Sequence, residues 1–362
     1  MSEFEDNYNT LDKTLHRLAF NTVKIQKWLA EFESDLYRTQ LRSIEVERPV
    51  FISGLPRCGT TALLNVLCRA EEFCFHTYQD MPFLFTPIIW SQLSQRFKKK
   101  LPWTERAHRD GLKINQSSPE AFEEMLWQAF WPTKYSSSIS VWSTNRSEQF
   151  DSFFVQHIKK MMLREQKSGE CRHQRYISKN NLNIARISYI KSLFPDSIVV
   201  VPFREPVQHA YSLYKQHQNF IELHKSNAFA RSYMKAIGHY DFGIDFKPIN
   251  FNLWHDSASS NPNELIFWLE YWQQTYQFVL KHFAQSCIFV DYDYLCQNPQ
   301  NSIEVLSAAL QIQPSNIESQ VSGIRSATKH NLNTTMLSES LVLSCSNIHE
   351  QLQTISVNHS QR

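Results

Sequence analysis

The chain has 362 residues, of which 42% are hydrophobic, and its formal net charge at pH 7 is +2. A chain of this length can bury a sizeable core in one large or two ordinary domains, and the nearly balanced charge argues against a nucleic-acid-binding protein. The first residues are acidic and no apolar run approaches the ~18 residues of a membrane span, so we expect neither a secretory signal nor an integral membrane segment. The seven cysteines show no Cys-x-x-Cys pair and no metal spacing, which indicates reduced thiols in a cytoplasmic protein.

Residues 9 to 40 predict one long amphipathic helix, because apolar side chains recur in alternating steps of three and four. These positions are Leu11, Leu15, Leu18, Ile25, Leu29, Phe32 and Leu36. We expect the helix to pack on its own domain, within an N-terminal layer of residues 1–47. A homodimer through this helix is the alternative, although the heptad match is short and Thr22 interrupts it.

Residues 50–68 predict a buried strand (50–52), a tight loop (54–59) and a helix (60–68). A loop entering a helix N-terminus directs backbone N–H groups and the positive end of the helix dipole at one point, which favours an anionic ligand. Gly54 and Gly59 match the Walker A pattern, but Thr60 stands where that pattern has Lys. Arg57 is the only cation within the loop that can take over the role of that Lys.

A short strand at 73–75 follows the helix and leaves His76 and Asp80 at the carboxyl edge of the sheet, where ligands of open α/β sheets bind. Each residue also has a structural interpretation. Asp80 could cap a helix or turn ahead of Met81-Pro82, and His76 could be an ordinary packed or solvated histidine.

Residues 84–176 are rich in aromatic side chains and poor in glycine, so we expect a mostly helical insertion. Within it, Ser118 and Pro119 predict the start of a helix over residues 121–130. His108-Arg-Asp and Asp241-Phe-Gly match two protein-kinase motifs, but these lie about 130 residues apart without a kinase glycine loop, and we attribute them to chance.

A second anion-binding pattern comes later in the chain. Residues 198–201 are a continuous β-branched run, as in a central parallel strand, and residues 207–220 predict the helix that follows. Arg204 ends the strand, and Ser212 lies about two helical turns further on, where its hydroxyl can face an anion held by Arg204. Pairing of Arg204 with Glu205 or another acid is the alternative.

The remaining elements are a helix over 265–283, a strand and turn over 287–295 and a helix to residue 310. Residues 330–362 are rich in Ser, Asn and Gln, and we expect them to be flexible.

The two anion-binding patterns together resemble those of sulfotransferases that use 3′-phosphoadenosine-5′-phosphosulfate (PAPS), in the Pro-Arg-x-Gly-Thr-Thr branch that includes bacterial carbohydrate and tyrosylprotein sulfotransferases. The resemblance covers most of residues 48–315, motif by motif. It implies a P-loop-like α/β fold of three layers, with a central parallel sheet flanked by helices. It also implies one domain over 48–325, with residues 84–176 as an acceptor-side insertion and 326–362 as a polar extension. The Arg-Lys-Gly loop of cytosolic relatives is missing, and Gly323, Arg325 and Lys329 offer only a weak substitute.

The resemblance also implies roles for individual residues. The 5′-phosphosulfate would bind the loop residues Pro56, Arg57, Cys58, Gly59, Thr60 and Thr61, and the 3′-phosphate would bind Arg204 and Ser212. Asp80 is the first candidate for the base that deprotonates the acceptor, ahead of His76 and then His108. Lys179, at the junction of a strand and a helix, would contact the sulfuryl group or the acceptor, unless it is an ordinary surface lysine.

The sequence therefore predicts a PAPS-dependent sulfotransferase that needs no metal and acts on an acceptor hydroxyl, preferably of a carbohydrate or glycolipid. Arg57 would stabilise the leaving phosphate, and the base would need a pKa raised by burial. The alternatives are a P-loop kinase that uses Mg-ATP and an inactive nucleotide-binding scaffold.

Overall fold

The computed structural model describes residues 22–95, 104–105, 113–115, 118–166, 174–257, 261–313, 324, 329–332 and 337–359. Within these ranges, a five-stranded parallel sheet has the order β2-β5-β1-β6-β7. The bounds are β1 (Val50–Ile52), β2 (Phe73–Cys74), β5 (Arg175–Lys179), β6 (Ile198–Phe203) and β7 (Cys287–Asp291). Two further strands, β3 (Thr104–Glu105) and β4 (Lys113–Ile114), form a separate antiparallel pair.

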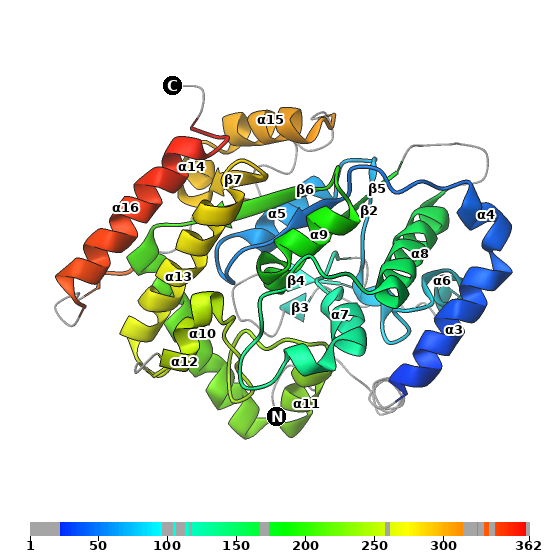
Figure 1. Ribbon diagram of the computed structural model, residues 1–362, viewed down its shortest axis with the longest axis horizontal. Coiled ribbons are helices and arrows are strands. Elements are labelled where there is room, and N and C mark those ends of the chain that lie inside the picture. The colour runs from blue at the N-terminus through cyan, green and yellow to red at the C-terminus, as the bar shows by residue number, and fades with distance from the viewer. Residues whose placement is uncertain are drawn as a thin grey trace.

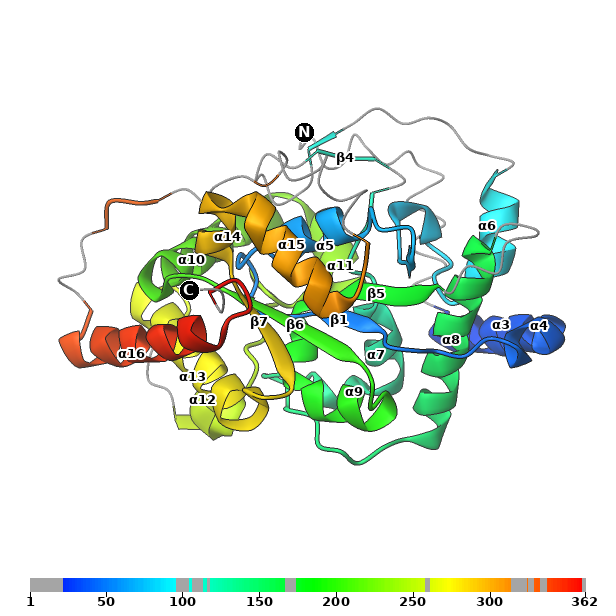
Figure 2. The same ribbon diagram turned by 90° about the horizontal axis from the view of Figure 1, so that it is seen from above.

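Helices cover both faces of the sheet, which confirms the predicted three-layer α/β fold (Figures 1 and 2). Successive side chains of β1 point to opposite faces, so Phe51 joins one core cluster while Val50 and Ile52 join the other. One face carries α5 (Thr60–Leu67), α14 (Tyr292–Gln297) and α15 (Pro299–Leu310). The opposite cluster contains residues of α7 (Glu124–Phe130), α8 (Glu148–Glu165), α9 (Ile187–Leu193), α10 (Pro206–Ser226) and α13 (Leu265–Phe283).

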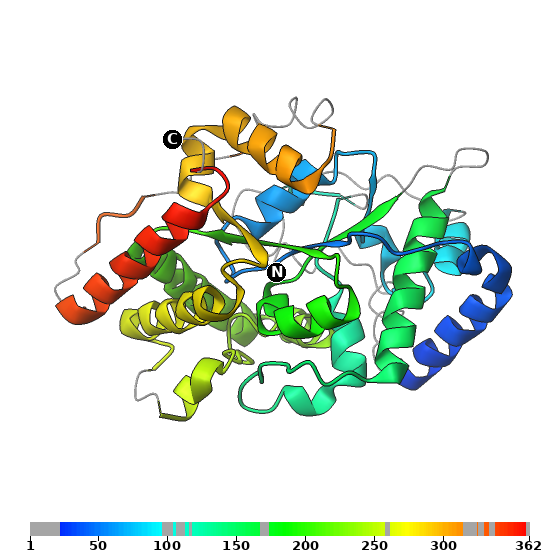
Figure 3. The same cartoon turned by 45° about the horizontal axis from the view of Figure 1, so that its top comes forward.

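The remaining helices lie around this centre. They are α3 (Val23–Leu36), α4 (Arg38–Arg42), α6 (Pro87–Gln95), α11 (Ala228–Ala236), α12 (Trp254–Ser257) and α16 (Glu339–Ile355), with the 3-10 helices η1 (Tyr78–Asp80), η2 (Pro132–Lys134), η3 (Asn181–Ala185) and η4 (Phe251–Leu253). Helices α3 and α4 lie at one end of the molecule and α16 at the other (Figure 3). Among the described residues, no helix has both the length and the apolar character needed to cross a membrane.

The N-terminal helix presents its faces in an unexpected way. Helix α3 packs on α8, but its buried residues are Gln26, Ala30 and Glu33. Its large apolar side chains are exposed instead, namely Ile25, Trp28, Phe32 and Leu36. The first half of the predicted helix lies outside the described residues, and the homodimer stays a prediction.

Two local expectations are wrong. Helix α7 begins at Glu124 rather than after Ser118, because the preceding segment pairs with residues that follow β2. The Glu120 N–H donates to the His76 carbonyl (2.9 Å), and Pro119 forms a bridge with Thr77. The C-terminal segment is not uniformly flexible, because α16 buries an apolar side formed by Cys345, Ile348 and Leu352 and packs against α13.

Candidate functional site

The loop between β1 and α5 lies at the carboxyl edge of the central strand of the sheet. Its two glycines have steric reasons to be glycine. A Cβ on Gly54 would lie 2.9 Å from the Cys58 sulfur, and a Cβ on Gly59 would lie 2.2 Å from the Tyr292 ring. Gly59 also has a φ of +95°, in the left-handed region that favours glycine. The loop is therefore held in one tight conformation that ends at the α5 N-terminus, where the first amides have no acceptor within the helix.

The second anion-binding pattern folds against this loop. The Arg57 Nε donates to the Ser212 hydroxyl (3.4 Å), and the Arg204 Nη1 donates to the Arg57 carbonyl (3.1 Å). Helix α10, which carries Ser212, begins directly after Glu205, whose carboxylate caps its first amides. The structure thus brings Arg57, Arg204 and Ser212 together, although the first and last are 155 residues apart.

His209 also contacts this group, although it was not among the predicted site residues. Its Nε2 donates to the Pro56 carbonyl at 2.7 Å, which fixes the proton on that nitrogen. Burial, together with the positive charges of Arg204 and Arg57, lowers the pKa of His209 to about 3. A neutral imidazole therefore supports the loop backbone. Its position on α10, the helix that carries Ser212, five residues after Arg204, is the signal that would have identified it.

Cys58 is buried in the loop, and burial raises its thiol pKa to about 12 despite the nearby charges of Lys179 and Arg204. The sulfur is therefore a protonated packing group at neutral pH, and the Cys58 backbone N–H faces the Leu55 carbonyl at 3.4 Å. Lys179 is the last residue of β5 and pairs in register with Ile52 of β1. Its ammonium group thus belongs to the same edge of the sheet as the loop.

A chain of polar contacts runs from the start of α5 to the loop after α11. The Thr60 hydroxyl donates to the Asn181 Oδ1 (3.3 Å), and the Asn181 Nδ2 donates to the Asp241 Oδ2 (2.9 Å). The His239 Nε2 lies 3.8 Å from the same Asp241 oxygen. Neither Asn181 nor His239 was predicted as a site residue, and Asp241 was noticed only as part of the Asp-Phe-Gly match.

Asp80 is buried and its carboxylate is fully engaged. Oδ1 accepts from Arg164 at 2.5 Å, while Oδ2 accepts from the Thr77 backbone N–H at 2.9 Å and lies 3.1 Å from the His76 Nδ1. Burial would raise the Asp80 pKa, but Arg164 and His76 outweigh it and hold the pKa below its ordinary value. The structure thus gives Asp80 the turn-capping interaction considered in the sequence analysis. Its role as a base stays a prediction.

His76 is also buried, and its Nε2 lies 3.1 Å from the Nε2 of His157 on α8. Burial and the neighbouring His76 lower the His157 pKa well below its ordinary value. His76 therefore lies between Asp80 and a neutral imidazole, and its role as an alternative base stays a prediction. His108, the third candidate, lies outside the described residues.

The acidic residues at the end of β7 and just after it accept hydrogen bonds from protein groups. Asp291 accepts from the Tyr294 backbone N–H (3.0 Å) and from Gln353 (2.9 Å). Asp293 accepts from the Glu205 backbone N–H at 2.8 Å and lies 3.4 Å from the Arg204 Nε. Both carboxylates hold the end of the sheet together.

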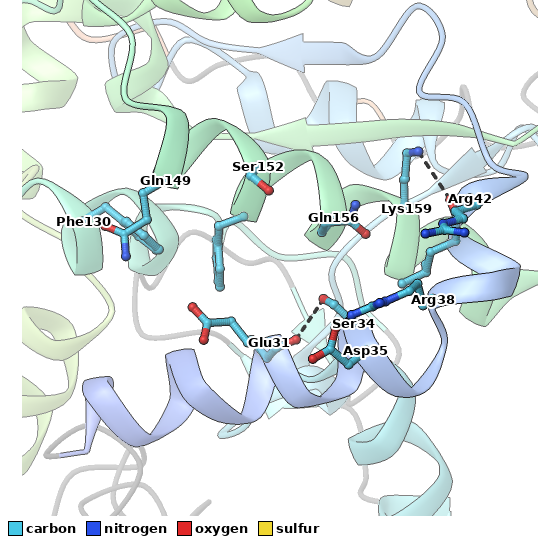
Figure 4. Close-up of a pocket in the computed structure, with 13 residues that line it drawn as sticks. Glu31, Ser34, Asp35, Arg38, Arg42, Phe130, Gln149, Ser152, Gln156 and Lys159 are labelled. Atoms are coloured by element: carbon cyan, nitrogen blue, oxygen red, sulfur yellow. Dashed lines mark hydrogen bonds and ion pairs between the residues drawn. The ribbon is translucent and has the colours of Figure 1, made fainter.

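A separate cavity of about 660 Å³ lies between α3 and α8 (Figure 4). Polar side chains dominate its lining, including Glu31, Asp35, Arg38 and Arg42 from the N-terminal helices and Lys159 from α8. None of the predicted site residues lines this cavity.

Comparison with known proteins gives the following results. The model of the "Sulfotransferase family" matches residues 49–245, more than half of the chain. No curated protein matches the sequence. Among solved structures, the chain is similar to sulfotransferase STF1 from Mycobacterium tuberculosis H37Rv (12% identity, TM-score 0.47, covering 95% of this chain and 88% of that one). It is also similar to sulfotransferase STF9 from Mycobacterium avium (12% identity, TM-score 0.46, covering 89% of this chain and 79% of that one). A third similar structure is a sulfotransferase from Alicyclobacillus acidocaldarius (13% identity, TM-score 0.33, covering 85% of this chain and 91% of that one).

Proposed function

Since the chain belongs to the sulfotransferase family, we propose that it transfers a sulfuryl group from PAPS to an acceptor hydroxyl. The observation that carries this proposal is the convergence of Arg57, Arg204 and Ser212 beside the α5 N-terminus. Two guanidinium groups and a helix start can bind two separate phosphate groups on one nucleotide. ATP lacks the 3′-phosphate that a second such position would recognise.

Arg57 and the backbone amides of residues 58–61 would bind the 5′-phosphosulfate, and Arg204 and Ser212 would bind the 3′-phosphate. During transfer, negative charge accumulates on the phosphate that leaves. Preorganised donors at that position are typically worth about 3–4 kcal/mol of barrier each. Lys179, at the same edge of the sheet, would contact the sulfuryl group or the acceptor.

Two features support this proposal over a kinase. Thr60 stands in the Walker Lys position, and Asp291 and Asp293 already accept hydrogen bonds from protein groups. For the acceptor we propose a carbohydrate or glycolipid hydroxyl, by analogy with the branch of sulfotransferases that shares the Pro-Arg-x-Gly-Thr-Thr motif.

The product nucleotide adenosine 3′,5′-bisphosphate tests the donor. At one hundred times its Kd it should stabilise the fold by about 2.7 kcal/mol, measured as a rise in Tm, and Mg-ATP should give a smaller rise at the same concentration. Transfer of labelled sulfuryl groups from PAPS to a panel of glycans, glycolipids, peptides and phenols then identifies the acceptor.

Arg57→Ala should weaken nucleotide binding and abolish transfer, with Arg38→Ala as a control on an exposed arginine of α4. Stabilisation by Mg-ATP without any response to the bisphosphate would indicate a kinase. Binding of the bisphosphate without transfer to any acceptor would indicate a scaffold.

A further inference from the structure

We infer that Asp241 is the base that takes the proton from the acceptor hydroxyl. The inference rests on the proposed sulfuryl transfer and names a catalytic residue for it. Asp241 follows α11, and its carboxylate reaches the phosphate loop through one intervening side chain. Asn181 donates to the Asp241 Oδ2 at 2.9 Å and accepts from Thr60, the first residue of α5, at 3.3 Å. The carboxylate is therefore fixed relative to the helix start that would hold the donor.

The second oxygen of Asp241 distinguishes it from the other acids nearby. Within the described ranges, no donor contacts its Oδ1, and the side chain keeps 12% of its surface exposed. Both oxygens of Asp80 are engaged, by Arg164 on one side and by His76 and Thr77 on the other. A base needs an oxygen that an acceptor hydroxyl can approach to hydrogen-bonding distance.

Glu120 is the other carboxylate close to this region, and it is engaged as well. Its Oε1 accepts from the Ala121 backbone N–H at 2.7 Å, and its Oε2 accepts from the Tyr78 hydroxyl. Of Asp80, Glu120 and Asp241, only Asp241 has an oxygen that accepts no hydrogen bond from a described group.

The charges around Asp241 suit the capture of a proton. The His239 Nε2 lies 3.8 Å from the Asp241 Oδ2, and burial lowers the pKa of His239, so this imidazole is neutral at pH 7. The charges of Lys179 and Glu120 act on the His239 imidazole with opposite signs. Burial raises the pKa of Tyr271 on α13, so its hydroxyl is neutral at pH 7. The Asn181 hydrogen bond orients the carboxylate without neutralising it.

The proposed step is balanced. The acceptor oxygen forms a bond to sulfur, and the bond between sulfur and the 5′-phosphate oxygen breaks. The electron pair of the broken bond stays on the phosphate, which Arg57 and the α5 amides bind. The acceptor proton moves to the Asp241 Oδ1 and is later released to water.

Asp241→Asn tests the role of the carboxylate. An Asn at this position can still accept the Asn181 hydrogen bond through its amide oxygen, so the fold and the donor site should be retained. Transfer from PAPS should fall about 10²–10⁴-fold, the usual contribution of a general base, while the Kd for adenosine 3′,5′-bisphosphate and the Tm stay unchanged. Asp241→Glu, which keeps a carboxylate, should retain more activity than Asp241→Asn even if the latter proves unstable.

Asp245→Asn is the matched control, because Asp245 lies four residues after Asp241 and its carboxylate pairs with Arg231; its transfer rate per folded molecule should stay close to that of the original protein. Asp80→Asn leaves Arg164 buried without its charged partner, so its Tm should fall, but it should lose less transfer activity per folded molecule than Asp241→Asn. A normal rate in Asp241→Asn would overturn the inference. Asn181→Ala removes the hydrogen bonds to both Thr60 and Asp241, so it measures the effect of positioning alone. If Asp241→Asn lost as much affinity for the bisphosphate as Asn181→Ala, the inference would also be overturned, because Asp241 would then only position Thr60. An unmutated protein that transfers no sulfuryl group would instead reject the proposed function itself.

Discussion

Gly59 is the residue on which the conformation of the phosphate loop depends most directly. It caps α5 with a left-handed φ of +95°, and the Tyr292 ring covers the side where a Cβ would project. Arg57 is also in the left-handed region, with a φ of +70°. Such backbone conformations are costly and cluster at binding sites, where the surrounding structure holds them.

We predict that Gly59→Ala weakens the binding of adenosine 3′,5′-bisphosphate by about five- to thirtyfold. An L-residue in the left-handed region costs about 1–2 kcal/mol, and each 1.4 kcal/mol corresponds to about tenfold in affinity. Isothermal titration measures the effect. Gly59→Ala combined with Tyr292→Ala removes the ring contact but not the backbone cost, so it should recover only part of the affinity. Unchanged binding by the single variant would contradict this account of the loop.

At the scale of elements, α3 shows that an apolar pattern does not by itself decide which face of a helix is buried. The Glu33 carboxylate is buried on α3 and lies 3.2 Å from the Lys160 Nζ of α8. Glu33 also accepts from the Ile89 backbone N–H at 2.7 Å, and Lys160 donates to the Ala30 and Phe85 carbonyls. These polar contacts join α3 to α6 and α8, while Trp28 and Phe32 stack on the exposed side.

We predict that Lys160→Met destabilises the protein by about 3–5 kcal/mol, because it leaves the Glu33 carboxylate buried without a positive partner. Chemical denaturation measures the free energy of unfolding. Glu33→Gln combined with Lys160→Met should recover much of the loss, since no charge is then buried. Trp28→Gln on the exposed face is the control and should change the stability by no more than about 0.5 kcal/mol. Equal losses in Lys160→Met and Trp28→Gln would mean that the outer face of α3 is also covered.

At the scale of the whole molecule, buried histidines link stability to pH. Burial lowers the pKa of His209 to about 3 and that of His217 to about 4. Below the ordinary histidine pKa of about 6.5 the unfolded chain binds protons at these positions, whereas the folded chain does not until the pH reaches the lowered values. Stability therefore rises with pH up to about 6.5 and falls as the pH drops below it.

We predict that the free energy of unfolding falls as the pH is lowered from about 6.5 to about 5, by up to about 1.4 kcal/mol per pH unit for each such histidine. Urea denaturation measures it, and the urea midpoint should fall over the same range. His217→Gln should flatten this slope, because the Gln amide oxygen can replace the Nδ1 that accepts the Gly243 N–H. His209→Gln should act similarly, since its amide can donate to the Pro56 carbonyl in place of the ring. A midpoint independent of pH over this range would show that these imidazoles titrate equally in both states.

Local sequence patterns were sufficient to predict several elements of the fold. The strand, loop and helix of residues 50–67 and the helix at 265–283 lie where the sequence predicts them. The spacing of Arg204 and Ser212 likewise follows from one strand end and two helical turns. In each case the signal is contained within about 20 neighbouring residues, so periodicity and loop glycines are sufficient.

Which of these residues contact one another, and which keep a side-chain oxygen available, depends on the packing of elements that are distant in the sequence. The Asp80 Oδ1 accepts a hydrogen bond from Arg164, which lies 84 residues away in the chain. Asp241 reaches the phosphate loop through Asn181, 60 residues before it. The burial of Glu33 likewise depends on α8. These contacts follow from the order of the strands and the packing of distant helices, which bring together side chains that no local pattern relates.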